Sequence, residues 1–306
     1  MVDRPLPFES NLFDLTPNAW LGRIDDLCDQ FGFFEQLGAQ HCAGFLEAGN
    51  NLIVTFENAE DVRAHNARAE PRGFEHARYD GWSHLSIMSF TQSWFRDSAI
   101  FDFFDRMVDD GFFEDFETIV FYGAGAGGYA AAAYCVAAPG ATVLALSPQA
   151  TLARQLAGWD WRFIQQRRND FCGRYGFAPD MIEGAGQVFV AYDPHVHLDA
   201  MHAALFYKPH VTMMPCPLLG TRIDHAFDRL GIHDVLLRLA MDGSLDAKRF
   251  RQLLRARRYD DSYAQSLITH LTDTGHRDMA KAICRYKEQR SKNPYYTDVL
   301  AALSGD

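Results

Sequence analysis

A glycine-rich stretch at residues 123–128, with the sequence Gly-Ala-Gly-Ala-Gly-Gly, has the spacing of two motifs that carry chemistry. In the first motif, G-x-G-x-x-G, the glycines let backbone N–H groups and a helix N-terminus hold a pyrophosphate. Folds of that type also place an acidic residue at the end of the next strand, where it binds the ribose. Residues 147–149 are instead Ser-Pro-Gln. A dinucleotide or other phosphate site is therefore one interpretation of the stretch.

The second motif is the nucleophile elbow, G-x-S-x-G, in which a sharp turn between a strand and a helix presents a nucleophile above the sheet. Gly123 and Gly127 align with its two glycines, so Gly125 takes the position of the nucleophile. Glycine has no side chain that could attack a carbonyl carbon. A third interpretation is a turn whose glycines serve only the close packing of a helix on its strand.

The longer sequence YGAGAGGYAAAAYCVAAPGATVLALSPQ, residues 122–149, resembles the elbow region of bacterial α/β-hydrolases. In that group the elbow reads tyrosine, glycine, serine, serine, methionine, glycine, glycine, tyrosine, and the following strand also tends to end in serine-proline-glutamine. The resemblance covers about residues 40–230 and departs from the group at Ala124 and Gly125, which replace both serines. It implies an α/β fold with a mostly parallel sheet flanked by helices and, in a working enzyme, a catalytic triad.

The resemblance also assigns positions to the other two triad members, which follow the nucleophile in the chain order acid, then histidine. Asp193, at the end of a predicted strand, matches the acid best, and Asp199 matches it second best. The histidine of the group follows a glycine in the loop after the last strand, and Thr221 takes that position here. His225, further along, would have to be recruited as a base from within a helix. The vestigial triad is therefore Gly125, Asp193 and Thr221, without nucleophile or base.

A loop after the predicted strand 82–90 has the sequence Thr-Gln-Ser-Trp-Phe-Arg-Asp. It resembles the loop that supplies an oxyanion-hole amide in this group of hydrolases. We expect a ligand pocket where this loop meets the elbow. The predicted lining residues are Trp94, Arg96, Gly123, Gly125 and Ala126. An alternative places Trp94 at the edge of the core and pairs Arg96 with an acidic neighbour.

The composition limits the classes of function. The 306 residues carry a net charge of −11, which disfavours nucleic acid as a partner because its phosphates would be repelled. The sequence starts without the apolar segment of a signal peptide, and no apolar run reaches membrane-spanning length, so we predict a cytoplasmic location without membrane association. Six scattered cysteines form no C-x-x-C pair, and the histidines at 195, 197 and 202 form no H-E-x-x-H motif, so no metal and no cofactor are predicted.

Hydrophobic patterning predicts the elements that position these residues. Residues 1–38 form a peripheral helical start in this prediction, and Gly49-Asn50 forms the turn of a hairpin between the apolar runs on either side. Buried strands are predicted at 82–90, 118–122, 142–146 and 187–193. A helix of small residues is predicted at 126–138.

We predict one α/β-hydrolase-like domain over residues 1–233, with a lid-like insertion at 150–186, followed by a helical appendage at 234–306. Basic residues between 248 and 258 form a stripe on one face of the first appendage helix. The stripe comprises Lys248, Arg251, Arg255 and Arg258. It faces solvent in the simplest interpretation, and an acidic partner in the alternative. A homo-oligomer formed through the C-terminal helices would bury their apolar faces.

These observations favour a protein that binds a small molecule or a partner without catalysis, because nucleophile and base are both missing and act as a unit. Two alternatives leave open whether the chain is an enzyme. One is a hydrolase that recruits a nucleophile from elsewhere in the fold. The other is a nucleotide-dependent oxidoreductase that uses residues 123–128 as a phosphate site, including the phosphoadenylyl-sulfate reductase type. Enzymes of that type use a phosphate loop with serine and aspartate and a reactive C-terminal cysteine, whereas Cys284 here lies in a predicted helix.

Overall fold

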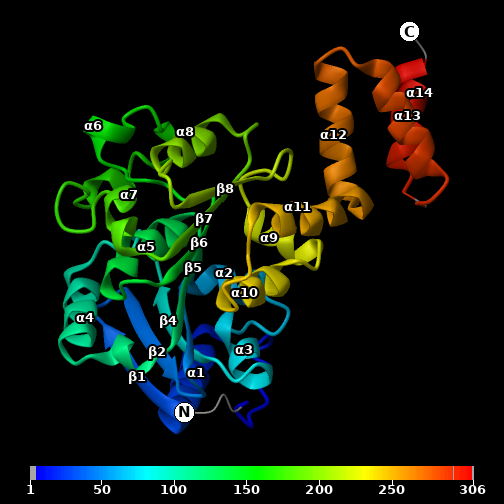
Figure 1. The fold of residues 1–306 in the computed structure, drawn as a ribbon. Helices are drawn as coiled ribbons and strands as arrows, with labels where there is room; N and C mark the ends of the chain where they lie inside the picture. The colour runs from blue at the N-terminus through cyan, green and yellow to red at the C-terminus, as the bar shows by residue number, and fades with distance from the viewer. Residues whose placement is uncertain (1–4, 292, 305–306) are drawn as a thin grey trace.

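The strands are apolar on both faces, as the buried residues 52–56 illustrate, and such strands belong in the interior of a parallel sheet. A computed structural model describes residues 5–291 and 293–304 of the chain (Figure 1). Its sheet has eight strands in the order β1-β2-β4-β3-β5-β6-β7-β8. The strands are β1 (Gly32–Leu37), β2 (His41–Leu46), β3 (Asn51–Asn58), β4 (Ser83–Ser89), β5 (Thr118–Ala124), β6 (Thr142–Leu146), β7 (Gln187–Tyr192) and β8 (Val211–Pro215).

The strands from β4 to β8 in this order run parallel to one another, and β1 and β2 add an antiparallel edge. The predicted fold class, a mostly parallel sheet flanked by helices, is confirmed. The order differs from the 3-2-1-4-5-6 order of dinucleotide-binding folds, whose glycine-rich loop follows the first strand. Here the glycine-rich loop follows β5, so the fold does not support the interpretation as a dinucleotide fingerprint.

The predicted hairpin around Gly49-Asn50 is wrong, because β3 pairs in parallel with β4 and β5 and does not pair with β2. The hairpin lies one element earlier, between β1 and β2, and its connection includes Gly38 at φ 61°. The segment 1–38 is therefore not helical throughout, since β1 follows α1 directly. Residues 1–4 of that segment lie outside the described residues.

Helices cover both faces of the sheet (Figure 1). They are α1 (Pro17–Phe31), α2 (Ala59–His65), α3 (Gly73–Tyr79), α4 (Ser98–Asp109), α5 (Ala126–Tyr134), α6 (Arg154–Ala157), α7 (Ala178–Met181), α8 (His197–Leu205), α9 (Ile223–Arg229), α10 (His233–Met241), α11 (Ala247–Leu253), α12 (Asp261–Asp273), α13 (Arg277–Glu288) and α14 (Tyr295–Ser304). The small-residue helix predicted at 126–138 ends earlier, at Tyr134, and continues as a 3-10 turn over Cys135–Ala137.

Two hydrophobic layers hold the helices against the sheet. On one face, α4 and α5 close a cluster in which Phe56, Phe104 and Tyr134 stack with ring centroids 4.6–6.0 Å apart. On the other face, α9 and α10 bury side chains such as Phe227 against the sheet cluster that contains Tyr122. The two layers fix α5 and α9 at the carboxyl edge of the sheet, where parallel sheets place their ligand sites.

The C-terminal helices fall into two groups. α10 and α11 pack on the sheet, because Leu237 of α10 and Phe250 of α11 belong to the same cluster as Tyr122. Helices α12–α14 share a separate small cluster and project from the body of the protein (Figure 1). The predicted boundary at residue 234 therefore falls among helices that pack on the sheet, and the separate cluster begins only with α12. Residues 292 and 305–306 of the predicted appendage lie outside the described residues.

The predicted basic stripe lies on α11 and on the 3-10 helix Leu254–Tyr259 that follows it. All four of its side chains are exposed, and none forms an ion pair with another described residue. The segment 150–186, predicted as a lid-like insertion, folds as α6, α7 and short 3-10 turns between β6 and β7. Over the described ranges, the structure contains no helix long and apolar enough to cross a membrane.

Candidate functional site

The turn between β5 and α5 has the backbone shape of a nucleophile elbow. Gly125 stands between the two elements at φ 55° and ψ −118°, a region that side-chain-bearing residues rarely adopt. Its N–H donates to the Leu146 carbonyl oxygen at 2.8 Å, and its own carbonyl oxygen accepts from the Tyr129 N–H at 3.0 Å. The strained turn is therefore anchored to β6 on one side and to α5 on the other.

The neighbouring glycines are required by close packing. A Cβ atom at Gly123 would lie 2.2 Å from the backbone of Gly127, and one at Gly127 would lie 2.1 Å from the Phe56 carbonyl oxygen. A Cβ atom at Gly125, in contrast, would meet no atom within 4 Å. Packing of α5 on the sheet thus explains Gly123 and Gly127, while the space at Gly125 remains open.

A cavity of about 560 Å³ lies above this turn, at the carboxyl ends of β3 to β6 and between α2, α9 and the insertion. Four residues that line it carry a buried polar atom with no hydrogen-bond partner among the described residues. These atoms are the Trp94 Nε1, Ser147 Oγ, Gln149 Oε1 and Asp199 Oδ2 atoms. A larger surface hollow of about 960 Å³, between α4, α7 and the insertion, shares no residue with the elbow. The elbow residue Gly125 therefore faces the smaller cavity and not the larger hollow.

The predicted pocket residues divide between the cavity and its surroundings. Trp94, Gly125 and Ala126 line the cavity. Gly123 does not line it, because it packs against the first turn of α5. Arg96 also lies away from it, since its Nε donates to a backbone carbonyl oxygen of the insertion at 2.8 Å and its guanidinium lies over aromatic rings. The prediction is therefore corrected at Gly123 and Arg96.

The loop expected to supply an oxyanion amide is also corrected. In the general arrangement of this fold that amide follows β3, the strand beside the elbow strand. Here β3 ends at Asn58 and leads into α2, whereas the predicted loop 91–97 follows β4. Both connections border the cavity, which Asn58 and Trp94 line together. The sequence does not reveal this arrangement, because the apolar run that forms β3 follows Gly49-Asn50 and resembles the second strand of a hairpin.

The predicted acid and the predicted recruited base do not meet. Asp193 is buried after β7, where its carboxylate accepts from the Gly220 N–H at 2.7 Å and the His195 N–H at 2.9 Å. Thr221 and His225 line the cavity, but Asp193 does not. His225 instead contacts acidic residues of α2 and α9. Asp193 therefore holds the loops after β7 and β8 together, and the imidazole beside it is that of His195.

Asp199, the second choice for the acid, belongs to an ion-pair network that ties the insertion to α8. Arg162 Nη1 donates to Asp199 at 2.7 Å, and its Nη2 donates to Asp160, also at 2.7 Å. The His202 ring lies 3.0 Å from the same Asp160 carboxylate. Burial alone would raise the pKa of Asp160, but the hydrogen bonds from His202 and Arg162 hold it below its ordinary value. Arg162 is thus already paired within the protein.

A serine, a histidine and an aspartate that the sequence patterns do not predict to be neighbours meet beside the cavity. The Ser93 hydroxyl lies 2.6 Å from Nε2 of His41, and Nδ1 of His41 lies 3.7 Å from a carboxylate oxygen of Asp97. Ser93 lines the cavity, and His41 is fully buried. Burial lowers the pKa of His41, which Asp97 partly offsets, so the ring is neutral near pH 7 and can accept a proton. The next two residues, Trp94 and Phe95, both have φ near +55° (54° and 55°), a strained conformation for aromatic residues.

One structural relation brings this group together. His41 begins β2 and Ser93 follows β4, and these strands are antiparallel neighbours with His41 opposite Ser89. Correct pairing of β2 with β4 would have predicted the contact. The predicted hairpin around Gly49-Asn50 pairs β2 with β3 instead, and that pairing does not bring His41 to this loop.

The strands below the cavity also bury a neutral histidine. His84 on β4 is fully buried, and its Nε2 lies 2.9 Å from the Thr55 hydroxyl on β3. Burial, aided by the nearby His76, lowers the pKa of His84 to about 3 from its ordinary value of 6.5. Between these two pH values the unfolded chain binds a proton at this position that the native protein does not bind.

We expect this histidine to make the protein less stable in acid. Because the pKa of His84 is lowered on folding, the free energy of unfolding falls as the pH falls below about 6.5, by about 1.4 kcal/mol per pH unit from this group. Denaturant unfolding at several pH values will show a shallower pH dependence for His84→Gln than for wild type. The matched control, His276→Gln at an exposed position, will keep the wild-type slope. Equal slopes for wild type and His84→Gln would contradict the assignment.

The strand order, the strained turn after β5 and the cavity at the carboxyl edge of the sheet together define a class of fold. They are the features of the α/β-hydrolase fold, in which the residue at the turn between the fifth strand and its helix faces the active site. The protein therefore has an α/β-hydrolase fold with a glycine at the tip of the elbow.

Comparisons with known proteins find only distant structural similarity. No protein-family description matches the sequence, and no curated protein matches it. Among solved structures, a thermostable carboxylesterase from a metagenomic library, EstE1, is 10% identical and covers 78% of this chain and 98% of its own, with a TM-score of 0.45. A bacterial brefeldin A esterase is 13% identical, with coverage of 83% and 90% and a TM-score of 0.41. MenH from S. aureus is 14% identical, with coverage of 64% and 97% and a TM-score of 0.37.

Proposed function

We propose that this protein binds a small polar molecule in the cavity above Gly125 and that its elbow catalyses no acyl transfer. The observation that carries the proposal is the open space at Gly125, where a turn of elbow geometry bears no side chain. In this proposal Gly125, Asp193 and Thr221 are the remnants of a triad. Neither Asp193 nor Thr221 supplies a base, since the first accepts two backbone hydrogen bonds and the second carries only a hydroxyl.

The unpartnered polar atoms around the cavity support the binding part of the proposal. A buried polar group without a partner destabilises a protein by about 1–3 kcal/mol. The Trp94 Nε1 atom is a donor, the Gln149 and Asp199 oxygens are acceptors, and the Ser147 hydroxyl can act as either. A molecule with both hydroxyl or amide donors and carbonyl or carboxylate acceptors matches this set. A purely apolar ligand does not.

A second candidate function is a hydrolase whose nucleophile is Ser93. The contact between Ser93 and His41 favours it, because a neutral imidazole at 2.6 Å can take the hydroxyl proton as the oxygen attacks. Asp97, at 3.7 Å from the other ring nitrogen, would stabilise the imidazolium that forms. The elbow would then line the site without taking part in the reaction.

A fluorophosphonate probe and p-nitrophenyl acetate distinguish the two candidates. We expect no covalent labelling and no ester turnover above the buffer rate for wild type or for Ser93→Ala. Labelling of wild type that disappears in Ser93→Ala would overturn the non-catalytic proposal in favour of the second candidate. Labelling that persists in Ser93→Ala would overturn both, and the mass of the labelled peptide would identify the residue that reacts.

The binding part is tested by thermal-shift screening against a library of small polar metabolites. We expect compounds that raise the melting temperature of wild type and lose at least about tenfold in affinity in Trp94→Phe, which removes the Nε1 donor. The matched control is Trp161→Phe, because Trp161 is 70% exposed on the insertion and does not line the cavity. Compounds that bind both variants and wild type equally well would place their site elsewhere and contradict the proposal.

A further inference from the structure

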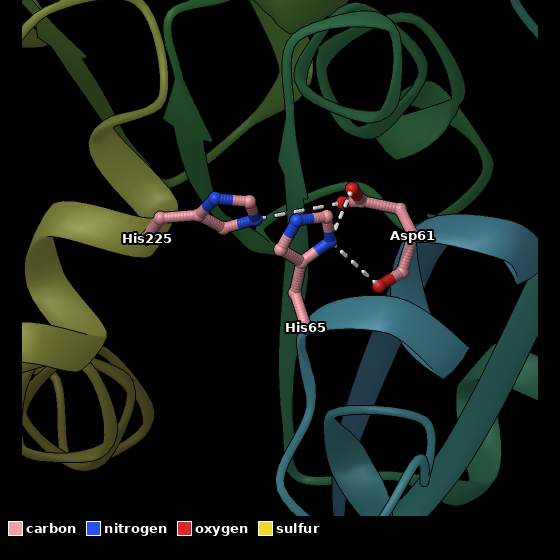
Figure 2. Close-up of side chains that lie close together, drawn as sticks. All are labelled: Asp61, His65 and His225. Atoms are coloured by element: carbon pink, nitrogen blue, oxygen red, sulfur yellow. Dashed lines mark hydrogen bonds and ion pairs between the residues drawn. The ribbon is translucent and has the colours of Figure 1, made fainter.

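Helices α2 and α9 approach each other beside the cavity, and three side chains meet between them (Figure 2). Asp61 and His65 lie one turn apart on α2, and His225 comes from α9. His65 Nδ1 lies 3.0 Å from Asp61 Oδ1, and His225 Nε2 lies 3.8 Å from Asp61 Oδ2. The two imidazole rings have centroids 4.2 Å apart. One ligand atom from each residue thus falls within 4.8 Å of the other two.

We propose that Asp61, His65 and His225 bind a divalent transition-metal ion, zinc by preference. Two imidazole nitrogens and one carboxylate oxygen are a ligand set that zinc takes in sites with one open position. Ligand atoms at about 2.0–2.2 Å from a tetrahedral zinc lie about 3.4 Å from one another. The 3.0 Å separation joins His65 to Oδ1 of Asp61, and the 3.8 Å separation joins His225 to Oδ2 of the same carboxylate. Both are close to this value, and one ligand atom from each residue lies within 4.8 Å of the other two, so rotations of these exposed or half-buried side chains would bring one atom of each to a single ion.

The local hydrogen bonds leave the required lone pair on His225. Nη2 of Arg222 contacts Nε2 of His225. A guanidinium has only donors, so this nitrogen must be the acceptor and carries no proton. The same Nη2 donates to Asp61 Oδ2 at 2.6 Å. Arg222 therefore bridges two of the three ligands in the way that a bound cation would.

Arg222 can leave this position without losing every partner. Its side chain is 47% exposed, and a different nitrogen, Nε, donates to Asp224 Oδ1 at 3.2 Å. A rotation of the guanidinium toward solvent would free Asp61 and His225 for a metal ion. Arg222 would then compete with the metal ion for Asp61 and His225. Removal of the Arg222 side chain should therefore increase the affinity for the metal ion.

The charge around the cavity favours a cation. Six lining residues carry carboxylates and three carry guanidinium groups. These residues are Glu57, Glu60, Asp61, Asp199, Asp224 and Asp228, and Arg72, Arg162 and Arg222. The excess of acidic groups lowers the energy of a divalent ion placed among them.

The metal would also narrow the class of ligand, an extension that rests on the proposed function. Asp61, His65 and His225 all line the cavity, so a position left open on the ion faces the space above the elbow. A small molecule with an anionic oxygen, such as a carboxylate, could bind zinc there directly. Metal binding itself needs no such ligand, and its test is independent of the cavity proposal.

Zinc binding is measured on the full chain, freed of any histidine tag, by calorimetric titration in the absence of organic ligand. We expect one zinc ion per chain, and at least a tenfold loss of affinity in His65→Ala and in His225→Ala, about the range for disrupted metal sites. Arg222→Ala should bind zinc about tenfold more tightly than wild type, because a positive charge next to the metal is removed. When cobalt replaces zinc, we expect the visible absorption bands of a four-coordinate cobalt site.

The control is a second pair of histidines outside the cavity. His195 and His270 have ring centroids 4.8 Å apart, and His195 contacts the carboxylate of Asp193, so this group resembles the proposed site in composition. His270→Ala should leave zinc affinity unchanged. Unfolding curves of each variant without zinc will show that the fold is kept. Absence of stoichiometric zinc in wild type, unchanged affinity in His225→Ala, or weaker binding in Arg222→Ala would each overturn the proposal.

Discussion

Replacing Gly127 with alanine is expected to lower the free energy of unfolding by about 3 kcal/mol, the upper range for an overpacked core position. The added Cβ atom would lie 2.1 Å from the Phe56 carbonyl oxygen and 3.2 Å from its carbonyl carbon. Both atoms belong to the backbone of β3, which is held between β4 and β5 by parallel pairing. The strand cannot give way, so α5 must move off the sheet. Denaturant unfolding of the purified variant measures the loss.

The matched comparison is Gly125→Ala, two residues earlier in the same turn. Its Cβ atom would meet nothing within 4 Å, and the change adds only the strain of a side chain at φ 55°. We expect a loss of about 1 kcal/mol from that strain. Equal losses at the two positions would contradict the packing argument and would show that helix α5 can shift on the sheet.

The second large effect is expected at Arg78, whose guanidinium is buried beneath the N-terminal segment. Nη2 of Arg78 donates to both carboxylate oxygens of Glu70, at 2.9 and 3.0 Å, and both side chains are 4% exposed. The Arg78 Nε also donates to the Phe8 carbonyl oxygen at 3.0 Å. Arg78→Met leaves a buried carboxylate without its partner and should lower the free energy of unfolding by about 3–5 kcal/mol.

A double variant separates the ion pair from the packing around it. When Glu70→Gln is added to Arg78→Met, no unpaired charge remains, so the double variant should be more stable than Arg78→Met alone. Denaturant unfolding of wild type, both single variants and the double variant completes the thermodynamic cycle. A double variant that is less stable than Arg78→Met would show that the charge of Glu70 is not the source of the loss.

The parts of this fold that the sequence predicts are those with local causes. The strand, glycine turn and helix around Gly125 are consecutive in the chain, and their apolar and small residues specify them without reference to distant segments. The same holds for the end of β7 at Asp193. Strand pairing has no such local cause, because a fully buried strand such as β3 presents the same apolar run to any neighbour.

The candidate site was less predictable for the same reason. The spacing of Asp61 and His65 predicts that they lie on the same face of a helix. No sequence pattern predicts that His225 of α9 lies beside them. Likewise, Ser93 meets His41 only because β2 and β4 are neighbours. The pocket around Trp94 is predicted by the resemblance to a known elbow. The sequence does not predict that Arg96 lies away from this pocket, because its hydrogen-bond partner is in the insertion.

Helices α12–α14 have a consequence for how the protein opens. Their hydrophobic cluster is built entirely from residues 264–303 and has no member in common with the sheet clusters. We expect such a segment to form a foldon of its own, which unfolds at a lower free energy than the whole chain. It contacts the body where Tyr263 packs against the sheet cluster and where His270 packs on His195, next to Asp193. Local unfolding of α12–α14 would therefore expose the loop after β7 while the sheet stays folded.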